Sequence, residues 1–433
     1  MSAKQSILGS AIALIGAVGA CGSPSTPSEE TADTASAATA CATVWSSTAV
    51  YTQGNVASYS GVNYVANWWT QGQNPSTNNG GSGSGQPWTS QGACGGTTPP
   101  PTDAGTPPPT DAGTPPPSNG SLLFSPYKDI TVNMNWNTNV MQTAITGSAI
   151  PVVGSGSLVS TQVPNLGAIT LAFATGDCGS EGWGGVTRTA FANANIPALS
   201  SAGLKYVVAT GGAAGTFRCA SQSGMKSFLD TYMSAQMVGV DYDIETGQSQ
   251  ADINNLVAQT AYALTIYPNL RFSFTLATLA ASDGSYGGLN ATGDMVVKAI
   301  KSAGLTKYTI NLMVMDFGNT AAANCVVVNG VCNMGQSAIQ AATNLQHTYG
   351  TPFSQIELTP MIGMNDTTSE VVSVADIDTI TNYAVAHGLA GLHHWSLDRD
   401  TPCSSSSASS TCNSVPSSTS VQYTKRFLTG LGR

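Results

Sequence analysis

Apolar residues in the last three-quarters of the chain alternate between short β-branched runs and longer stretches with helical spacing. The short runs predict strands, and the longer stretches predict amphipathic helices. Eight predicted strands cover residues 130–136, 168–174, 205–210, 238–245, 271–278, 308–317, 357–362 and 390–397. Predicted helices cover residues 225–237, 252–266, 291–303, 335–347 and 374–387.

Eight strands with intervening helices over residues 121–433 predict an α/β fold, the (β/α)8 TIM barrel. A doubly wound open sheet is the alternative, but the Gly-rich fingerprint of its nucleotide sites does not follow the first strand. In a barrel, functional side chains lie at the C-terminal ends of strands. Glu245, Asp316 and Trp395 fall at such ends.

The first 120 residues have a different pattern, which predicts four further segments. Residues 1–20 are typical of an export signal, with a basic start, an apolar centre and small residues before Cys21. The apolar centre is shorter than the about 20 residues that a helix needs to span a bilayer. Cys21 also fits a bacterial lipobox, so a lipid-anchored and a freely secreted extracellular protein both remain open. Residues 21–40 predict a disordered tether, 41–94 a small all-β module, and 95–120 a Pro-rich spacer.

The chain has nine cysteines. We expect eight of them to form disulfides, as is typical of exported proteins, and Cys21 to remain outside these pairs. Sequence neighbours predict the pairs Cys41–Cys94, Cys178–Cys219, Cys325–Cys332 and Cys403–Cys412. A zinc site is the alternative, but no Cys-x-x-Cys spacing is present.

Three carboxylates, Asp241, Asp243 and Glu245, alternate along the predicted strand 238–245 and should project to one face. Like charges on one buried face raise the proton affinity of Glu245, as a general acid near neutral pH requires. A calcium loop is the first alternative, but Thr246 stands where an EF-hand needs Gly. A solvated acidic strand is the second, but it does not explain the apolar residues on both sides.

Composition narrows the class of ligand. Only 9% of residues are charged and the net charge is −9, which argues against nucleic acid and anionic membranes. A bulk rich in Gly, Ser, Thr and Asn suits a neutral polysaccharide. We predict no cofactor, no metal and a monomer without a protein partner; His393 and His394 would face opposite ways in a strand and could not chelate one ion.

The small module is rich in aromatic residues, and a domain of its size cannot bury all of them. In a strand Trp68 and Trp69 would face opposite ways, so at least one should be exposed for sugar stacking, with a core role as the alternative. Residues 66–72, Ala-Asn-Trp-Trp-Thr-Gln-Gly, with Trp88 and a closing Gly-Ala-Cys, resemble the chitin- and cellulose-binding modules of families 5 and 12. Asn67 replaces the usual Lys. The resemblance implies that Trp68 and Trp69 form the sugar platform.

The barrel resembles glycoside hydrolase family 18, the chitinases and their relatives. Residues 238–245 are similar to its Asp-Gly-x-Asp-x-Asp-x-Glu, with Val238 for the first Asp. Residues 209–212, Ala-Thr-Gly-Gly, stand at the Ser-x-Gly-Gly of its third strand. Residues 313–316, Met-Val-Met-Asp, stand at the Met-x-Tyr-Asp of its sixth, and Trp395 at the Trp of its eighth.

This resemblance implies an exported chitinase that cleaves β-1,4 linkages between N-acetylglucosamine units with retention, assisted by the substrate's acetamide. Glu245 would be the general acid/base, Asp243 would stabilise the oxazolinium, and Asp241 would share its charge and proton. Trp395 would floor the sugar site, and Asp316 would contact substrate unless it only caps a helix. Met315 replaces the Tyr that binds the acetamide carbonyl. An endo-β-N-acetylglucosaminidase acting on N-glycans and a non-hydrolytic chitin-binding lectin are the alternatives.

Overall fold

The computed structural model describes residues 41–47, 49–52, 54–80, 86–94, 122–245 and 247–433. They belong to two compact units, which divide the chain between residues 111 and 112. The predicted export signal, Cys21, the tether and the Pro-rich spacer lie outside the described residues. Among the described residues, none of the helices combines the length and apolarity that crossing a bilayer requires.

The smaller unit is all-β, as predicted. A three-stranded antiparallel sheet packs over a small core in which Trp88 is fully buried, and a two-stranded pair lies beside it. The predicted disulfide Cys41–Cys94 closes the unit and compensates for its small core. The strands are β1 (Val50–Tyr51), β2 (Val56–Tyr59), β3 (Val62–Ala66), β4 (Thr70–Gln71) and β5 (Trp88–Ala93).

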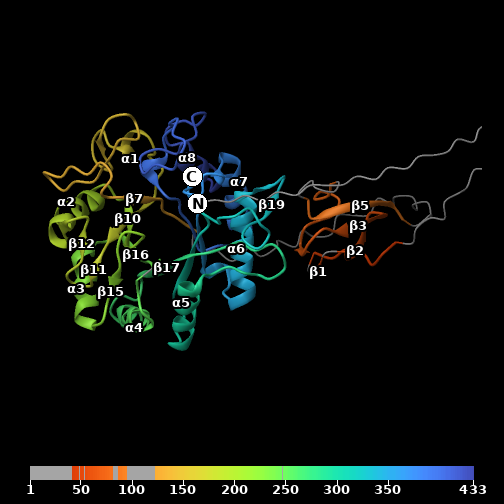
Figure 1. The fold of residues 1–433 in the computed structure, drawn as a ribbon, viewed down its shortest axis with the longest axis horizontal. Helices are drawn as coiled ribbons and strands as arrows, with labels where there is room; N and C mark the ends of the chain where they lie inside the picture. The colour runs from red at the N-terminus through yellow and green to blue at the C-terminus, as the bar shows by residue number, and fades with distance from the viewer. Residues whose placement is uncertain (1–40, 48, 53, 81–85, 95–121, 246) are drawn as a thin grey trace, which may run out of the picture. The chain divides into compact units, whose positions relative to one another are not determined.

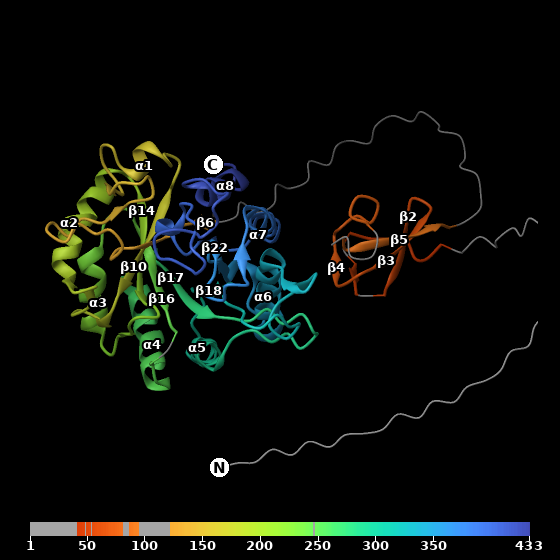
Figure 2. The same cartoon turned by 45° about the horizontal axis from the view of Figure 1, so that its top comes forward.

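The larger unit is built around one parallel sheet with helices outside it (Figures 1 and 2). In spatial order its strands are β6 (Leu123–Phe124), β24 (Gly391–Leu392), β21 (Ile356–Thr359), β18 (Thr309–Met313), β17 (Arg271–Ala277), β16 (Met237–Asp243), β14 (Lys205–Gly211), β10 (Ala168–Ala174) and β7 (Tyr127–Asp129).

The sheet closes on itself because β6 and β7 follow one another in a single extended segment. Leu123 of β6 pairs with Gly391 of β24, and Tyr127 of β7 pairs with Thr170 of β10. The backbone N–H of Tyr127 also donates to the carbonyl of His394, 3.1 Å away. The two short strands therefore act as the first of eight barrel strands, and the predicted TIM barrel is confirmed.

The first barrel strand was placed wrongly at residues 130–136. The alternation of Ile130, Val132, Met134 and Trp136 imitates a half-buried strand, but this segment is a loop in which Asn133 has a positive φ of 61°. The first barrel strand is instead formed by β6 and β7, where the buried polar residues Ser125 and Lys128 hide the β pattern.

The helices follow the strands, and most of them begin at polar caps, whereas the N-terminal cap of α8 is Val421. Thr187, Ser221, Ser249, Asn290 and Ser373 each accept a backbone N–H of the first turn. The helices are α1 (Leu158–Thr161), α2 (Arg188–Ser201), α3 (Gln222–Tyr232), α4 (Gln250–Ile266), α5 (Ala291–Ser302), α6 (Met334–Tyr349), α7 (Val374–His387) and α8 (Gln422–Gly430), with 3-10 turns η1 (Phe353–Gln355) and η2 (Leu397–Arg399).

Short strand pairs and three disulfides stiffen the loops between these elements. The disulfides are Cys178–Cys219, Cys325–Cys332 and Cys403–Cys412, as predicted. The loop strands are β8 (Gln142–Thr143), β9 (Ile150–Pro151), β11 (Gly176–Asp177), β12 (Gly182–Trp183), β13 (Val186–Thr187), β15 (Phe217–Arg218), β19 (Val327–Val328), β20 (Val331–Cys332), β22 (Gly363–Met364) and β23 (Val371–Val372).

Candidate active site

A cavity of about 740 Å³ opens where the barrel strands end. Five of the residues singled out in the sequence line it, namely Asp243, Glu245, Met315, Asp316 and Trp395. Asp241 lies deeper and is 2% exposed, whereas Trp68 and Trp69 belong to the other unit. The barrel therefore brings together side chains from the fourth, sixth and eighth strands.

The alternation of β16 positions the acidic residues. Tyr242 points outward, where its hydroxyl accepts a hydrogen bond from Thr260 of α4 at 3.2 Å. Asp241 and Asp243 therefore point into the barrel, where both are almost fully buried. The strand ends at Asp243, earlier than predicted, yet Glu245 still lines the cavity and remains partly exposed.

Two glycines allow the neighbouring strand to approach this site closely. Gly211 and Gly212 have φ values of 85° and 82°. A Cβ on Gly211 would overlap the carbonyl oxygen of Asp243, and one on Gly212 would lie 2.9 Å from the Phe173 ring. Only glycine combines this backbone conformation with these contacts.

Three hydroxyl groups hold the Asp241 carboxylate. Ser273 and Thr275 each donate to its Oδ1 at 2.6 Å, and Tyr127 donates to its Oδ2 at 2.8 Å. Burial raises the pKa of Asp241, and these three hydrogen bonds oppose that rise because they stabilise the ionised form.

A second layer of polar side chains orients two of those hydroxyls. The Asn311 amide nitrogen donates to the Tyr127 hydroxyl at 2.9 Å and to Thr275 Oγ1 at 2.8 Å, while its carbonyl accepts from Thr359 at 2.8 Å. Because an amide nitrogen can only donate, both hydroxyl protons are left to point toward Asp241. The chain of hydrogen bonds thus favours negative charge on Asp241.

Asp243 lies between Asp241 and Glu245 in a different environment. Its Oδ1 is buried without a hydrogen-bond partner among the described residues. Burial, the charge of Glu245 and the charge of Asp241 hold the pKa of Asp243 well above its usual value. Burial also raises the pKa of Glu245. The arrangement favours a charged Asp241, a protonated Asp243 and a proton that Asp243 shares with Glu245.

One side of the cavity is aromatic. The Trp395 indole stacks on the Phe173 ring with centroids 5.6 Å apart and planes inclined by 23°. Tyr127 contacts both rings, with centroids 6.1 and 6.2 Å away. Trp395 remains partly exposed and lines the cavity, so one face of the site offers a flat apolar surface.

Met315 and Asp316 stand at the end of the sixth strand. The helix-cap alternative for Asp316 is wrong, because its Oδ1 accepts the backbone N–H of Thr367 at 2.7 Å and α6 begins much later. Burial raises the pKa of Asp316, although the bond from Thr367 opposes this shift. Buried Glu370 fixes the same turn by accepting the N–H groups of Phe317 and Gly318, each at 2.9 Å. Met315 offers this wall of the cavity no strong hydrogen-bond donor.

The two adjacent histidines bond on different sides of the last strand. His393 lies 2.8 Å from Glu357 through Nε2, and His394 lies 3.1 Å from Thr424 of α8 through Nε2. Within the described part of the chain, no group of three His, Cys, Asp or Glu side chains is placed to hold a metal ion.

In the small unit, Trp68 and Trp69 are 44% and 56% exposed. The prediction that at least one of them is exposed is confirmed. Both lie between β3 and β4, so the prediction of a strand at these two residues is wrong. Trp88 takes the core role instead, with its indole N–H donating to the carbonyl of Gln73 at 2.8 Å.

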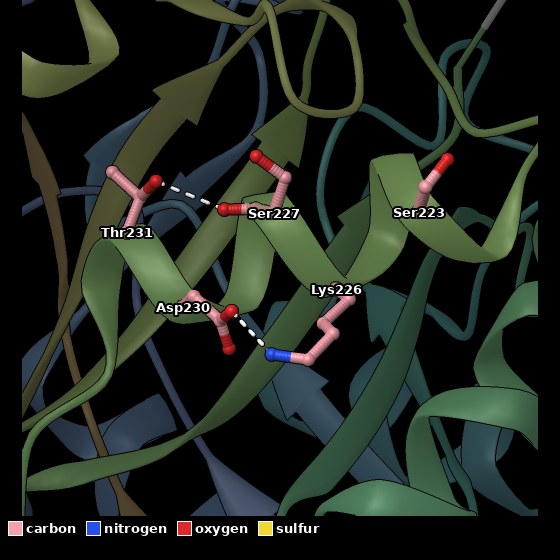
Figure 3. Close-up of a pocket in the computed structure, with 5 residues that line it drawn as sticks. All are labelled: Ser223, Lys226, Ser227, Asp230 and Thr231. Carbon is pink, nitrogen blue, oxygen red and sulfur yellow. Dashed lines mark hydrogen bonds and ion pairs between the residues drawn. The ribbon is translucent and has the colours of Figure 1, made fainter.

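A second, shallow depression lies along α3, away from these residues (Figure 3). Its polar groups bond one another: Lys226 pairs with Asp230 at 2.5 Å, and Thr231 donates to the carbonyl of Ser227 at 2.9 Å. These groups are already bonded to one another, so we do not assign this depression a catalytic role.

Comparisons with known proteins agree with both units. Residues 44–89 match the family model of carbohydrate-binding module family 5/12. A 52-residue segment is 44% identical to an endoglucanase of Microbulbifer sp., covering 12% of this chain and 10% of that protein. A further 226 residues are 26% identical to a probable bifunctional chitinase/lysozyme of Escherichia coli, covering 48% of this chain and 24% of that protein. The chain therefore matches only a small part of the length of these relatives.

Among solved structures, two chitinase domains of Pyrococcus furiosus share the fold of the larger unit. Active domain 2 superposes with a TM-score of 0.53 at 20% identity, and the catalytic domain of a hyperthermophilic chitinase with a TM-score of 0.52 at 22% identity. Each match covers 72% of this chain and 95% of the other. At this identity the likeness establishes the fold.

Proposed function

We propose that this protein is an exported chitinase that hydrolyses β-1,4 linkages between N-acetylglucosamine units. The observation that carries the proposal is the position of Glu245 on the cavity wall beside the nearly buried Asp243, with Asp241 deeper in the barrel. The family 5/12 module and the barrel shared with chitinase domains support the same substrate.

Glu245 lines the cavity at the end of the acidic strand β16, remains partly exposed and has a pKa raised by burial, so we assign to it the protonation of the glycosidic oxygen. The N-acetylglucosamine unit whose anomeric carbon forms the cleaved bond supplies the nucleophile: its acetamide oxygen attacks that carbon. The bond to the departing sugar breaks as the proton arrives. Water opens the resulting oxazolinium with Glu245 as base, and the configuration is retained.

Asp243 accepts a hydrogen bond from the acetamide nitrogen, and the negative charge that three hydroxyl groups hold on Asp241 stabilises the positive oxazolinium. Trp395 forms the flat floor beneath the reacting sugar, and Asp316, which also lines the cavity, contacts substrate. Since Met315 supplies no strong donor, orientation of the acetamide depends chiefly on Asp243.

Hydrolysis of colloidal chitin with initial release of the β-anomer, followed by NMR, tests this function. Release of glycans from a high-mannose glycoprotein without cleavage of chitin would favour an endo-β-N-acetylglucosaminidase. Binding of chitin with no hydrolysis of either substrate would favour a lectin.

Replacing both Trp68 and Trp69 with Ala is expected to weaken binding to insoluble chitin by roughly 10²-fold, since each ring contributes on the order of 1–2 kcal/mol. Activity on soluble oligosaccharides should not change, because the module acts by raising local substrate concentration. A depletion assay on chitin particles measures the binding. Val44→Ala, which truncates a side chain of the same unit that is 72% exposed, is the control. Equal loss in the control would contradict a specific platform.

A further inference from the structure

Trp136 is an exposed aromatic side chain on the same face of the barrel as the cavity. Its indole is 56% exposed, an unusual state for the largest apolar side chain. It lies in the loop that follows β7, and loops after parallel strands lie at the C-terminal face of a barrel.

The turn that carries Trp136 is ordered by its own hydrogen bonds. The Asn135 side chain accepts the backbone N–H groups of Asn137 and Thr138 at 3.1 and 3.2 Å. The Asn135 N–H donates to the carbonyl of Val140 at 3.0 Å. The ring is therefore presented on a closed turn.

Both ends of this turn are fixed to the barrel. Met134 and Met141 are buried in the main core. Asn195 of α2 donates to the carbonyl of Asn139 at 2.8 Å and accepts the N–H of Met141 at 2.9 Å. The exposure of the indole thus results from an anchored backbone, and binding a ligand here would order little additional chain.

A short series of contacts connects Trp136 to the cavity. Asp129 lines the cavity, and its Oδ1 accepts the N–H and the hydroxyl of Thr131 at 2.9 and 2.7 Å. Gly184, in the β12–β13 hairpin, packs against both neighbours: a Cβ there would lie 2.5 Å from the Thr131 methyl and 3.9 Å from the indole. Asp129, Thr131 and Gly184 therefore connect the cavity edge to the indole.

We propose that Trp136 is an outer subsite, where a pyranose ring of the chain bound in the cavity stacks on the indole; this inference rests on the proposed function. Trp395 follows the eighth strand and Phe173 lies on the second, and both line the cavity. The first strand lies between these two strands, and Trp136 is in the loop after it. Exposed Asn137 and Thr138 beside the ring offer hydrogen bonds to sugar hydroxyls. A single flat ring among polar groups fits a sugar better than a protein surface.

Replacing Trp136 with Ala in the full chain is expected to raise KM for N-acetylglucosamine hexasaccharide about tenfold and to leave kcat unchanged. Kinetics on a disaccharide with a chromogenic leaving group should not change, because that substrate does not extend beyond the cavity. Trp136→Tyr, which keeps a flat ring, should restore most of the hexasaccharide affinity.

Val385→Ala on α7, which also truncates an apolar side chain that is 52% exposed, is the matched control and should change neither substrate. An unchanged KM for the hexasaccharide in Trp136→Ala, or an equal loss on both substrates, would overturn the subsite. A wild-type protein that cleaves neither substrate would instead overturn the proposed function, and the subsite with it.

Discussion

Replacing Glu245 with Gln is expected to lower kcat on soluble chitin oligosaccharides by about 10³-fold and to leave KM nearly unchanged. Gln preserves the shape of the side chain but has no proton to give. Asp243 is not expected to take over, because it is only 5% exposed and its pKa is held well above its usual value, so that it releases a proton reluctantly. Steady-state kinetics on the hexasaccharide measure both constants.

Asp366→Asn is the matched control for this loss. Asp366 is exposed and lines the same cavity, so its replacement removes a carboxyl group from the cavity without removing the proposed proton donor. We expect its kcat to stay close to that of the wild type. Hydrolysis by Glu245→Gln at the wild-type rate would show that another group donates the proton.

The acidic residues could be placed from sequence because their pattern is local. Asp241 and Asp243 share a face through the period of two in β16, and closure of the barrel buries that face. The end of the strand was less predictable: Glu245 lies beyond the ladder, but its side chain still enters the cavity.

The groups that support Asp241 could not be found in this way. Tyr127 and Asn311 are 184 residues apart in sequence and meet only because the barrel closes. Tyr127 was hidden further by the wrong position of the first strand. The one available signal was the presence of Ser273 and Thr275 at alternate positions of a strand otherwise rich in Phe and Leu.

The exposure of individual aromatic rings could not be predicted from the sequence either. The alternation ending at Trp136 predicted a strand, whereas the anchored turn directs this ring to solvent. Helices α2 and α8 were not predicted: α2 contains Pro197, a residue that usually ends a helix, and α8 has only 9 residues and follows a Ser-rich loop.

Replacing Asp243 with Asn is expected to lower kcat about 10²-fold and to move the alkaline limb of its pH profile to lower pH. In the wild type, Asp243 and Glu245 share protons, and the last proton leaves against the repulsion of a second negative charge. In the variant, burial alone raises the pKa of Glu245, so its proton leaves at lower pH. The pH dependence of kcat on the hexasaccharide measures this shift. A limb that stays in place would contradict the shared protons.

The same variant is expected to be more stable than the wild type, by an amount that grows with pH. A carboxyl whose pKa is raised on folding binds its proton more tightly in the folded state. Its contribution to the free energy of unfolding therefore falls as pH rises above the ordinary pKa of Asp. An amide at this position does not ionise, so this loss is absent. Calorimetric Tm values at about pH 4 and about pH 8 test the sign. A Tm difference that narrows as pH rises would show that Asp243 does not hold its proton in the folded barrel. It would also show that the acidic site does not lower the stability of the protein.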